Sequence, residues 1–379
     1  VKAFSFICTM WKTSQLLNDP QIGLQLRPLT YNRHLRELWV GLSTIEEKWT
    51  AFIDELPSDI YLLGSLVPDS KLIKELKQLA SNEALFWEDQ WIAYSSDNEA
   101  SIPKNRKVLA DRPTYIAYPE DLLSANSQAL VNEIQANDVD LGDLTNRGNT
   151  VIHPENCYID PSAEISGTIL DASQGPIYIG ANTKIQIGTL IQGPAAILDG
   201  AITNLGAKIR PNTTIGKGCK VGGEISASLF FPYSNKAHEG YLGNSIIGSF
   251  CNLGALTTGS NVRNDLKNVY LYDYRTLQAR DTGLKSFGVL MGDFVCTGIL
   301  TKFNTGTVIG NHCNISGSTF LPKFIPSLTW GEFPNVSEYL PAKAIENAKA
   351  WIQAKNQEIP ENLLSKLEQI WKEEANARN

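Results

Sequence analysis

The chain has 379 residues, of which 42% are hydrophobic and 19% are charged, and its formal net charge at pH 7 is −7. This length allows two or three domains and an apolar core of ample size. No segment reaches the roughly 18 uninterrupted apolar residues of a membrane helix, and the start lacks the features of a signal peptide, so we expect a soluble cytoplasmic protein. Without a cluster of lysines and arginines, nucleic acid is not expected as a ligand.

The first part of the chain, residues 1–147, mixes apolar runs with helical patterns. The apolar runs are Ala3–Cys8, Ile60–Leu66 and Trp91–Tyr94, and the helical stretches are Ile45–Leu56 and Ser70–Leu79. This alternation predicts a small α/β domain. A polar stretch with Asp and Gly punctuation and no clear period follows over Asn137–Asn149, and it predicts the linker to the next domain.

An aliphatic residue recurs at every sixth position through the middle of the chain. A six-residue period fits neither a helix nor an alternating strand, but it is typical of a solenoid in which each hexamer forms one flat face of a triangular coil. Glycines that repeatedly follow the aliphatic residue predict tight corners. We therefore expect a left-handed parallel β-helix of hexapeptide repeats over residues 148–325. The periodic positions are Ile179, Ile185, Ile191, Ile197, Ile209, Ile215, Val221, Ile247, Leu253, Met291, Thr297, Phe303, Ile309 and Ile315.

Two features interrupt or follow this period. The hexad register is lost over Asn261–Ser286, a polar excursion of the kind that solenoids place on their binding face. Beyond Trp330 the apolar spacing becomes helical over Ala342–Ala354 and Asn362–Ala375. We expect residues 326–379 to form a helical cap, because an uncovered last coil exposes core and strand edges.

His238 is the strongest candidate for a catalytic residue. Polar side chains and glycine-opened backbone recur near it at coil intervals, and Glu224 lies upstream, where its carboxylate could bind one ring nitrogen and fix the tautomer. A histidine base suits an amine nucleophile, which must lose a proton to attack, and backbone N–H groups at Leu253-Gly254 are candidate donors to an oxyanion. The other histidines show no metal-ligand spacing, so we expect no metal site on the coil.

The block His238-x-x-Tyr241-Leu242-Gly243, with Asn252-x-Gly254-Ala255 and Asn261 after it, resembles the acetyltransferase domain of the bifunctional N-acetylglucosamine-1-phosphate uridylyltransferase/glucosamine-1-phosphate acetyltransferase family. The resemblance covers roughly residues 150–325. It implies that His238 is the general base, that Glu224 orients it, and that acetyl-CoA is the cosubstrate. Further implied contacts are Arg210, Lys236, Tyr241, Asn252 and Asn261 for the amino sugar phosphate and Gly254, Ala255, Gly298 and Gly317 for acetyl-CoA. Two positions depart from the family: Ser226 replaces a lysine, and Val262 replaces a tyrosine.

The N-terminal domain shows a second resemblance. Leu26-Arg27-Pro28-Leu29-Thr30 is similar to the segment after the phosphate loop of sugar nucleotidylyltransferases, which implies nucleotide contacts from Arg27, Thr30 and Arg33 and Mg²⁺ if this domain is active. The glycine-rich loop itself and the Pro-Lys pair of that family are absent, so we expect a reduced nucleotidylyltransferase-like domain. The whole layout is most similar to an alternative branch of the bifunctional family found in Bacteroidetes-type bacteria.

These observations predict a transferase that moves an acetyl group from acetyl-CoA to an amino sugar phosphate resembling glucosamine-1-phosphate, in the synthesis of UDP-N-acetylglucosamine or a related sugar nucleotide. One alternative is a sugar-1-phosphate nucleotidylyltransferase with the coil as a trimerising scaffold. Another is a non-catalytic sugar-nucleotide-binding module. We also expect a homotrimer, because a single coil is convex on every face and clefts form only between neighbouring coils, where the excursion Asn261–Ser286 is placed to reach across.

Overall fold

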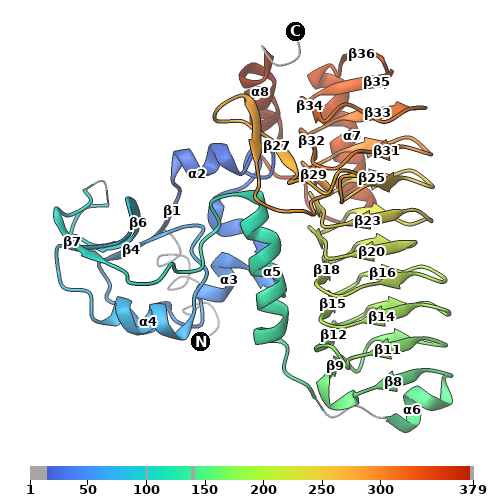
Figure 1. The fold of residues 1–379 in the computed structure, drawn as a ribbon, viewed down its shortest axis with the longest axis horizontal. Helices are drawn as coiled ribbons and strands as arrows, with labels where there is room; N and C mark the ends of the chain where they lie inside the picture. Colours follow the sequence, from blue (N-terminus) through green and yellow to red (C-terminus); the bar gives the residue numbers. More distant parts are fainter. Residues whose placement is uncertain (1–14, 100, 138–140, 376–379) are drawn as a thin grey trace. The chain divides into compact units, whose positions relative to one another are not determined.

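The computed structural model describes residues 15–99, 101–137 and 141–375 (Figure 1). The predicted apolar run Ala3–Cys8 lies outside these residues. The described chain divides into two compact units: the first contains residues 15–26 with Arg33–Ala125, and the second contains Arg27–Asn32 with residues 126–375. In the described part of the chain, no helix is both long enough and apolar enough to cross a membrane.

The first unit is built on a mixed sheet with the strand order β1-β4-β6-β5-β7. β1 runs parallel to β4, with Leu16 opposite Leu62, whereas β6 is antiparallel to both β4 and β5. This confirms the predicted α/β class. The strands are β1 (Leu16–Leu17), β4 (Ile60–Leu63), β5 (Glu83–Trp87), β6 (Gln90–Ser95) and β7 (Asn105–Val108), and a small hairpin joins β2 (Trp39–Val40) to β3 (Ser43–Thr44).

Short helices with local caps complete this unit. In α4 (Ser70–Lys77) the Asp69 carboxylate accepts from the N–H groups of Lys71 and Leu72, and Leu72, Ile73 and Leu76 are buried. The expected helix over Ile45–Leu56 is broken into α3 (Ile45–Trp49) and the 3₁₀ turn η2 (Ile53–Glu55). The other helical segments of the first half of the chain are α2 (Pro20–Gln25), η1 (Leu35–Glu37), α5 (Pro119–Glu133), α6 (Leu141–Asn146) and η3 (Pro154–Asn156). Of these, α6 lies in the stretch expected to be a linker.

A parallel β-helix follows, as the six-residue period predicts, and it is left-handed. The turns of the coil contribute parallel strands to three faces, which we call the six-stranded, nine-stranded and ten-stranded face (Figure 1), and β26 (Thr258–Gly259) and β31 (Lys302–Phe303) form a separate parallel pair. The six-stranded face holds β8 (Thr150–Ile152), β11 (Ile169–Asp171), β14 (Leu190–Gln192), β17 (Lys208–Ile209), β20 (Glu224–Ser226) and β23 (Tyr241–Gly243).

The other two faces are longer. The nine-stranded face holds β9 (Cys157–Ile159), β12 (Ile177–Ile179), β15 (Ala195–Ile197), β18 (Thr213–Ile215), β21 (Leu229–Phe230), β24 (Ile246–Ile247), β29 (Val289–Met291), β32 (Thr307–Ile309) and β34 (Phe324–Ile325). The ten-stranded face holds β10 (Glu164–Ile165), β13 (Lys184–Ile185), β16 (Ile202–Thr203), β19 (Lys220–Val221), β22 (Asn235–Lys236), β25 (Asn252–Leu253), β30 (Cys296–Thr297), β33 (Asn314–Gly317), β35 (Thr329–Phe333) and β36 (Asn335–Glu338).

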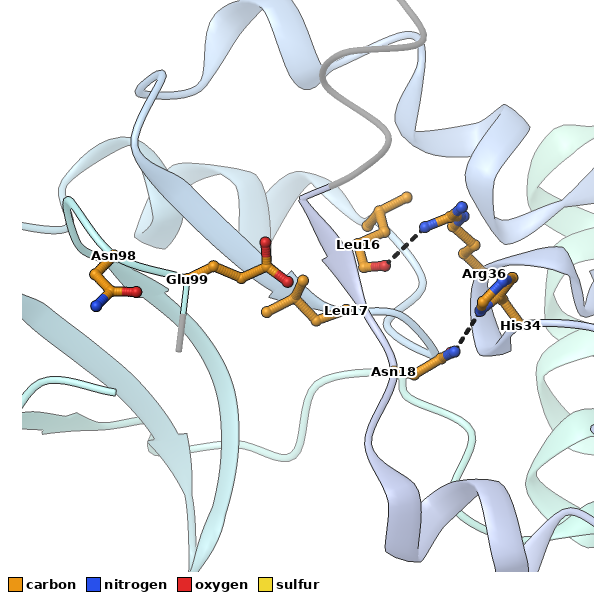
Figure 2. Close-up of a pocket in the computed structure, with 7 residues that line it drawn as sticks. All are labelled: Leu16, Leu17, Asn18, His34, Arg36, Asn98 and Glu99. Carbon is orange, nitrogen blue, oxygen red and sulfur yellow. Dashed lines mark hydrogen bonds between the residues drawn. The ribbon is translucent and has the colours of Figure 1, made fainter. Parts of the chain in front are cut away.

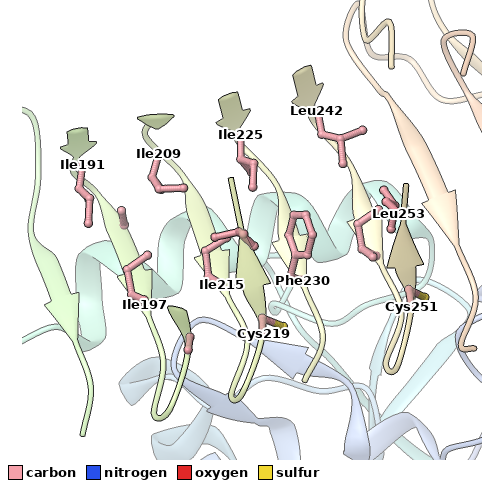
Figure 3. Packing of buried hydrophobic residues seen from close by; sticks show 14 of the residues in the cluster. Ile191, Ile197, Ile209, Ile215, Cys219, Ile225, Phe230, Leu242, Cys251 and Leu253 are labelled. Atoms are coloured by element: carbon pink, nitrogen blue, oxygen red, sulfur yellow. The ribbon is translucent and has the colours of Figure 1, made fainter. Parts of the chain in front are cut away.

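Side chains from the strands of all three faces enter the coil and build a continuous apolar core. Figure 3 shows Ile191, Ile209, Ile225 and Leu242 on successive strands of the six-stranded face, with Ile215 and Phe230 inside the same core. All of these residues are at most 1% exposed. The periodic aliphatic positions therefore face inward, as predicted.

The excursion over residues 261–286 is folded onto its own coil. β27 (Tyr270–Asp273) and β28 (Gln278–Asp281) form an antiparallel hairpin. The Tyr272 ring stacks on Phe324 of β34 with centroids 3.6 Å apart, and Tyr274 meets the same ring edge-on at 5.6 Å. Two aromatic contacts thus fix the hairpin to the nine-stranded face, and its expected reach across a cleft between neighbouring coils stays a prediction.

The predicted C-terminal helices are present as α7 (Pro341–Ala354) and α8 (Leu363–Glu373). They do not simply cover the last coil. Their buried residues pack with Phe294 and Leu328, which are coil corners, and the Lys355 ammonium after α7 binds Gly218 O and Asn235 Oδ1 several turns earlier. The ten-stranded face instead ends in the antiparallel pair β35–β36, in which the chain turns back on itself. The last strand, β36, is exposed along its length.

Aromatic rings form a column along one corner of the coil. Tyr233, Phe250, Phe294 and His312 all have left-handed φ angles between 54° and 70°, a conformation that costs a non-glycine residue about 1–2 kcal/mol. Their rings stack face to face at successive centroid distances of 5.1, 5.2 and 4.7 Å, which offsets that cost. His312 is 1% exposed, and within the described chain neither ring nitrogen has a hydrogen-bonding partner.

The buried His312 predicts a pH-dependent loss of stability. Burial lowers the pKa of its imidazole to about 4 in the folded chain, whereas an unfolded histidine titrates near 6.5. Between these pH values His312 is protonated in the unfolded chain and neutral in the folded chain, so the free energy of unfolding falls as the pH drops from about 6.5 to 4. The variant His312→Phe keeps the stacked rings but has no titrating group at this position. We expect its unfolding free energy to fall less on acidification than that of the wild type, by on the order of 3 kcal/mol. Urea unfolding at pH 7.5 and pH 4.5 measures this. Equal pH dependence in both proteins would contradict it.

Candidate functional site

Three predicted site residues gather on the outside of the six-stranded face. Glu224 on β20 is paired with Tyr241 on β23, and Arg210 follows β17, whose Lys208 is paired with Glu224. Arg210 and Glu224 line a groove of about 290 Å³ that also includes Asp171. Neighbouring parallel strands lie about 4.8 Å apart, so the coil brings together residues that are 14 to 31 positions apart in the sequence.

The pKa of the Tyr241 hydroxyl shows that Glu224, Asn261 and Arg210 lie close to it. Partial burial raises its pKa, the Glu224 carboxylate raises it further, and the Asn261 amide and the Arg210 guanidinium lower it. Asn261 also donates to Asn244 Oδ1 at 2.7 Å. Arg210, Glu224, Tyr241 and Asn261 therefore form one polar cluster, although Asn261 begins the excursion and lies after the last strand of this face.

The groove carries two cations available to an anion. Within the described chain, neither Lys208 nor Arg210 forms an ion pair, and both line the same groove. Lys208 was missed in the sequence, although the alternation Lys208-Ile209-Arg210 around an inward isoleucine contains the signal. Residues i and i+2 of a strand share a face, so an outward arginine implies an outward lysine.

His238 stands on the edge between the ten-stranded and six-stranded faces. It follows β22 and precedes β23, and its side chain is exposed. Among the described residues, no hydrogen bond reaches its imidazole, and the expected bond from Glu224 is not formed. Glu224 instead lies beside Tyr241 on the neighbouring strand, and its backbone N–H donates to Gly240 O at 3.2 Å. The structure therefore leaves the orienting role of Glu224 as a prediction.

The residues expected to contact acetyl-CoA follow His238 along the same edge. Asn235 is paired with Asn252, so His238 is in register with Ala255 of the next turn. A Cβ on Gly254 would lie 2.5 Å from Gly298 O, which shows that these corners stack directly. Gly317 ends β33 one turn later. The Gly254 N–H is already bonded to Thr297 O at 3.1 Å, so the next N–H, that of Ala255, is the donor left at this corner among the described residues.

Two expected substrate contacts lie elsewhere. Lys236 occupies an inward position of β22, is 1% exposed, and donates to the carbonyl oxygens of Gly222 and His238 at 3.2 and 2.6 Å. It is therefore not available to a ligand. Asn252 lies on the ten-stranded face, in the outward row between Asn235 and Cys296, and not beside Tyr241.

The first unit contains a separate pocket of about 560 Å³ at the carboxyl end of β1 (Figure 2). Asn18 hydrogen-bonds the His34 ring, and the Arg36 guanidinium donates to Leu16 O at 3.3 Å. Glu99 faces these groups from the loop after β6. No sequence motif indicates this pocket, because its polar residues come from three segments that only the folded unit brings together.

The expected nucleotide contacts do not line this pocket. Arg27 forms an ion pair with Glu373 and stacks over the Tyr31 ring, both in the second unit. The Lys366 ammonium donates to Asn32 O at 2.5 Å. Arg27 and Thr30 thus belong to a segment held by the C-terminal helices, whereas Arg33 lies in the first unit.

Comparisons with known proteins give separate matches for the N-terminal part of the chain and for the coil. Residues 15–138 match the family model of sugar nucleotidyl transferases. The chain is 34% identical over 167 residues to the bifunctional protein GlmU of Methanocaldococcus jannaschii, covering 39% of this chain and 40% of that protein. It is 28% identical over 284 residues to GlmU of Clostridium kluyveri, covering 68% and 60%. The chain therefore spans less than two thirds of these relatives. The matches confirm the resemblance to GlmU proteins.

Two further comparisons concern the coil. An uncharacterized acetyltransferase, YaiX of Escherichia coli, is 29% identical over 164 residues, covering 43% of this chain and 70% of that protein. Among solved structures, the polysialic acid-specific acetyltransferase NeuO matches with a TM-score of 0.29 and 12% identity, covering 55% of this chain and 94% of that one. A UDP-N-acetylglucosamine acyltransferase of Francisella novicida matches with a TM-score of 0.28 and 12% identity, covering 60% and 87%.

Proposed function

We propose that this chain, a relative of the bifunctional GlmU proteins, transfers an acetyl group from acetyl-CoA to the amino group of a phosphorylated amino sugar such as glucosamine-1-phosphate. The observation that carries the proposal is that the groove lies on the six-stranded face and that His238 stands on an edge of the same face. The groove offers a phosphate two cations, Lys208 and Arg210, neither of which forms an ion pair among the described residues. Glu224, Tyr241 and Asn261 offer hydrogen bonds to sugar hydroxyls beside it.

The chemistry needs a base at the amine and donors at the thioester. His238 accepts the proton of the sugar amine as the C–N bond forms, and the tetrahedral oxyanion accepts a hydrogen bond from the Ala255 N–H. The C–S bond then breaks, and the coenzyme A thiolate leaves with a proton returned by His238. The exposed imidazole of His238 and the free N–H of Ala255, one turn away on the same edge, support these roles.

Substitution of His238 and Arg210 tests the proposal. Loss of the base in His238→Ala should lower kcat by roughly 10²–10⁴-fold, with unchanged unfolding, because the side chain is exposed. Arg210→Ala should raise KM for the phosphorylated sugar and leave KM for acetyl-CoA unchanged. Lys184→Ala, which removes a cation from the ten-stranded face, is the control. Release of free thiol from acetyl-CoA and glucosamine-1-phosphate measures turnover, and wild-type kcat in His238→Ala would exclude the assignment.

We also propose that the working unit is a homotrimer. Apolar side chains are exposed along the His238 edge, where Leu205, Leu256 and Ile299 are 64%, 51% and 69% exposed. Ile169 and Leu190 on the six-stranded face are 42% and 43% exposed. Exposed apolar residues in such a line indicate a protein interface, and closed threefold packing of coils would place this edge in a cleft.

Light scattering tests this assembly. The mass should be near three times the 41.8 kDa of the chain. Leu205→Glu combined with Ile299→Glu should give monomers, because buried unpaired carboxylates oppose association. Val108→Glu, at a 63% exposed site in the first unit, should remain trimeric. A monomeric wild-type protein that keeps full acetyl transfer at high dilution would refute a shared site.

A second candidate function is sugar-nucleotide binding by the first unit. The match to sugar nucleotidyl transferases and the pocket at the carboxyl end of β1 favour it, since open α/β sheets bind ligands at the carboxyl ends of parallel strands. After β1 comes Asn18-Asp19-Pro20, and Asp19 caps α2. No glycine-rich loop is therefore present there to surround a triphosphate with backbone N–H groups.

Nucleotidyl transfer should accordingly be weak or absent. Without those N–H groups the leaving pyrophosphate lacks the donors that stabilise its charge. We expect no pyrophosphate release above background from UTP and N-acetylglucosamine-1-phosphate with Mg²⁺, while calorimetry with UDP-N-acetylglucosamine detects binding that Arg36→Ala weakens. Pyrophosphate release at rates typical of enzymes would overturn this prediction.

A further inference from the structure

Lys236 breaks the rule that governs every neighbouring strand of the ten-stranded face. Its backbone partner Val221 and the following inward residues Leu253 and Ile315 place aliphatic side chains in the core. Lys236 directs a lysine side chain into the same row and is 1% exposed. Removing an ammonium from water is costly unless it is well compensated, so an aliphatic residue here would favour the fold more simply.

The compensation comes from the corner on which His238 stands. The Lys236 ammonium donates to His238 O at 2.6 Å and to Gly222 O at 3.2 Å. Burial lowers its pKa to about 8, which keeps most of the charge near pH 7. The lysine thus reaches from the core to the carbonyl of the proposed base itself.

Other contacts fix the rest of this corner. The Asn204 amide donates to Ala237 O at 2.6 Å, and the Glu224 N–H donates to Gly240 O at 3.2 Å. Gly222 allows this close stacking, because a Cβ there would lie 2.4 Å from Ala237 O. Three carbonyls around His238 are therefore bound, and the bond to its own carbonyl comes from a charged donor, which is stronger than a neutral one.

We infer that Lys236 is a positioning residue, which ties the main chain of the His238 corner to the coil core and so sets the direction of the imidazole. This inference rests on the proposed function of His238. It assigns Lys236 a role in kcat and none in substrate affinity. The positioning role also explains why a lysine is buried in the inward row of the ten-stranded face, where the other strands place apolar or small hydroxyl side chains.

Lys236→Leu separates this role from a purely structural one. Leucine satisfies the core as Leu253 does, so the urea midpoint should be equal to or higher than that of the wild type. The released corner should lower kcat by about 10- to 100-fold, with KM for both substrates within about twofold. Thr183→Val is the control, because it removes another buried donor to a corner carbonyl, that of Gly180, far from His238. Its kcat should equal that of the wild type.

Two further measurements keep the inference testable. Propylammonium should restore part of the kcat of Lys236→Ala by filling the cavity, and it should have no effect on His238→Ala. Amide hydrogen exchange at residues 237–241 should be faster in Lys236→Leu than in the wild type. Wild-type kcat and unchanged exchange in Lys236→Leu would overturn the inference. If the wild type itself lacks acetyl transfer, the proposed function fails, and faster exchange alone still supports the tether.

Discussion

The interior of the coil accepts only the inward side chains of its stacked strands, and the rest of the second unit depends on this constraint. The inward row must be apolar to stabilise the turns, so polar groups are confined to outward rows and corners. The same constraint spaces them, because consecutive parallel strands are about 4.8 Å apart. Lys208, Glu224 and Tyr241 occupy one outward row and are adjacent for that reason. A rigid stack is a good scaffold for a site that must hold several groups at fixed separations.

The positions that depart from the constraint are informative. At Lys236 the departure is compensated by two carbonyl oxygens, one of them at the candidate base. At the corner occupied by His312, the imidazole stacks on Phe294, and the apolar residues of α7 and α8 pack around Phe294. The carbonyl contacts of Lys236 thus hold one corner of the coil, and ring stacking and helix packing hold another.

The segment Arg27–Asn32 shows how tertiary context changes the meaning of a motif. Its sequence is similar to a nucleotide-binding segment, yet Arg27 pairs with Glu373, and Asn32 donates to Asp293 at 3.1 Å. Buried Glu374 next to these residues accepts from the N–H and hydroxyl of Ser327. Burial raises the pKa of Tyr31 and of Tyr274, and the Glu374 carboxylate raises both further. The segment therefore completes a polar cluster of the second unit, and its nucleotide contacts stay a prediction.

The six-residue period by itself determined the coil and its inward residues, and helical apolar spacing determined the C-terminal helices, because periodicity reports directly which side of an element is buried. Arg210, Glu224, Tyr241 and Asn261 were named from the family resemblance, and the stacked turns bring them together. Only the tertiary structure decided where Lys236 and Asn252 lie. The chain from Val221 to Lys236 and from Lys236 to Leu253 is shorter than three hexads, so Lys236 falls in register with Val221 and lies inward, and Asn252 belongs to a different face from Tyr241. The pocket of His34 and Arg36 was likewise hidden, because long-range strand pairing, which leaves no periodic trace, brings its residues together.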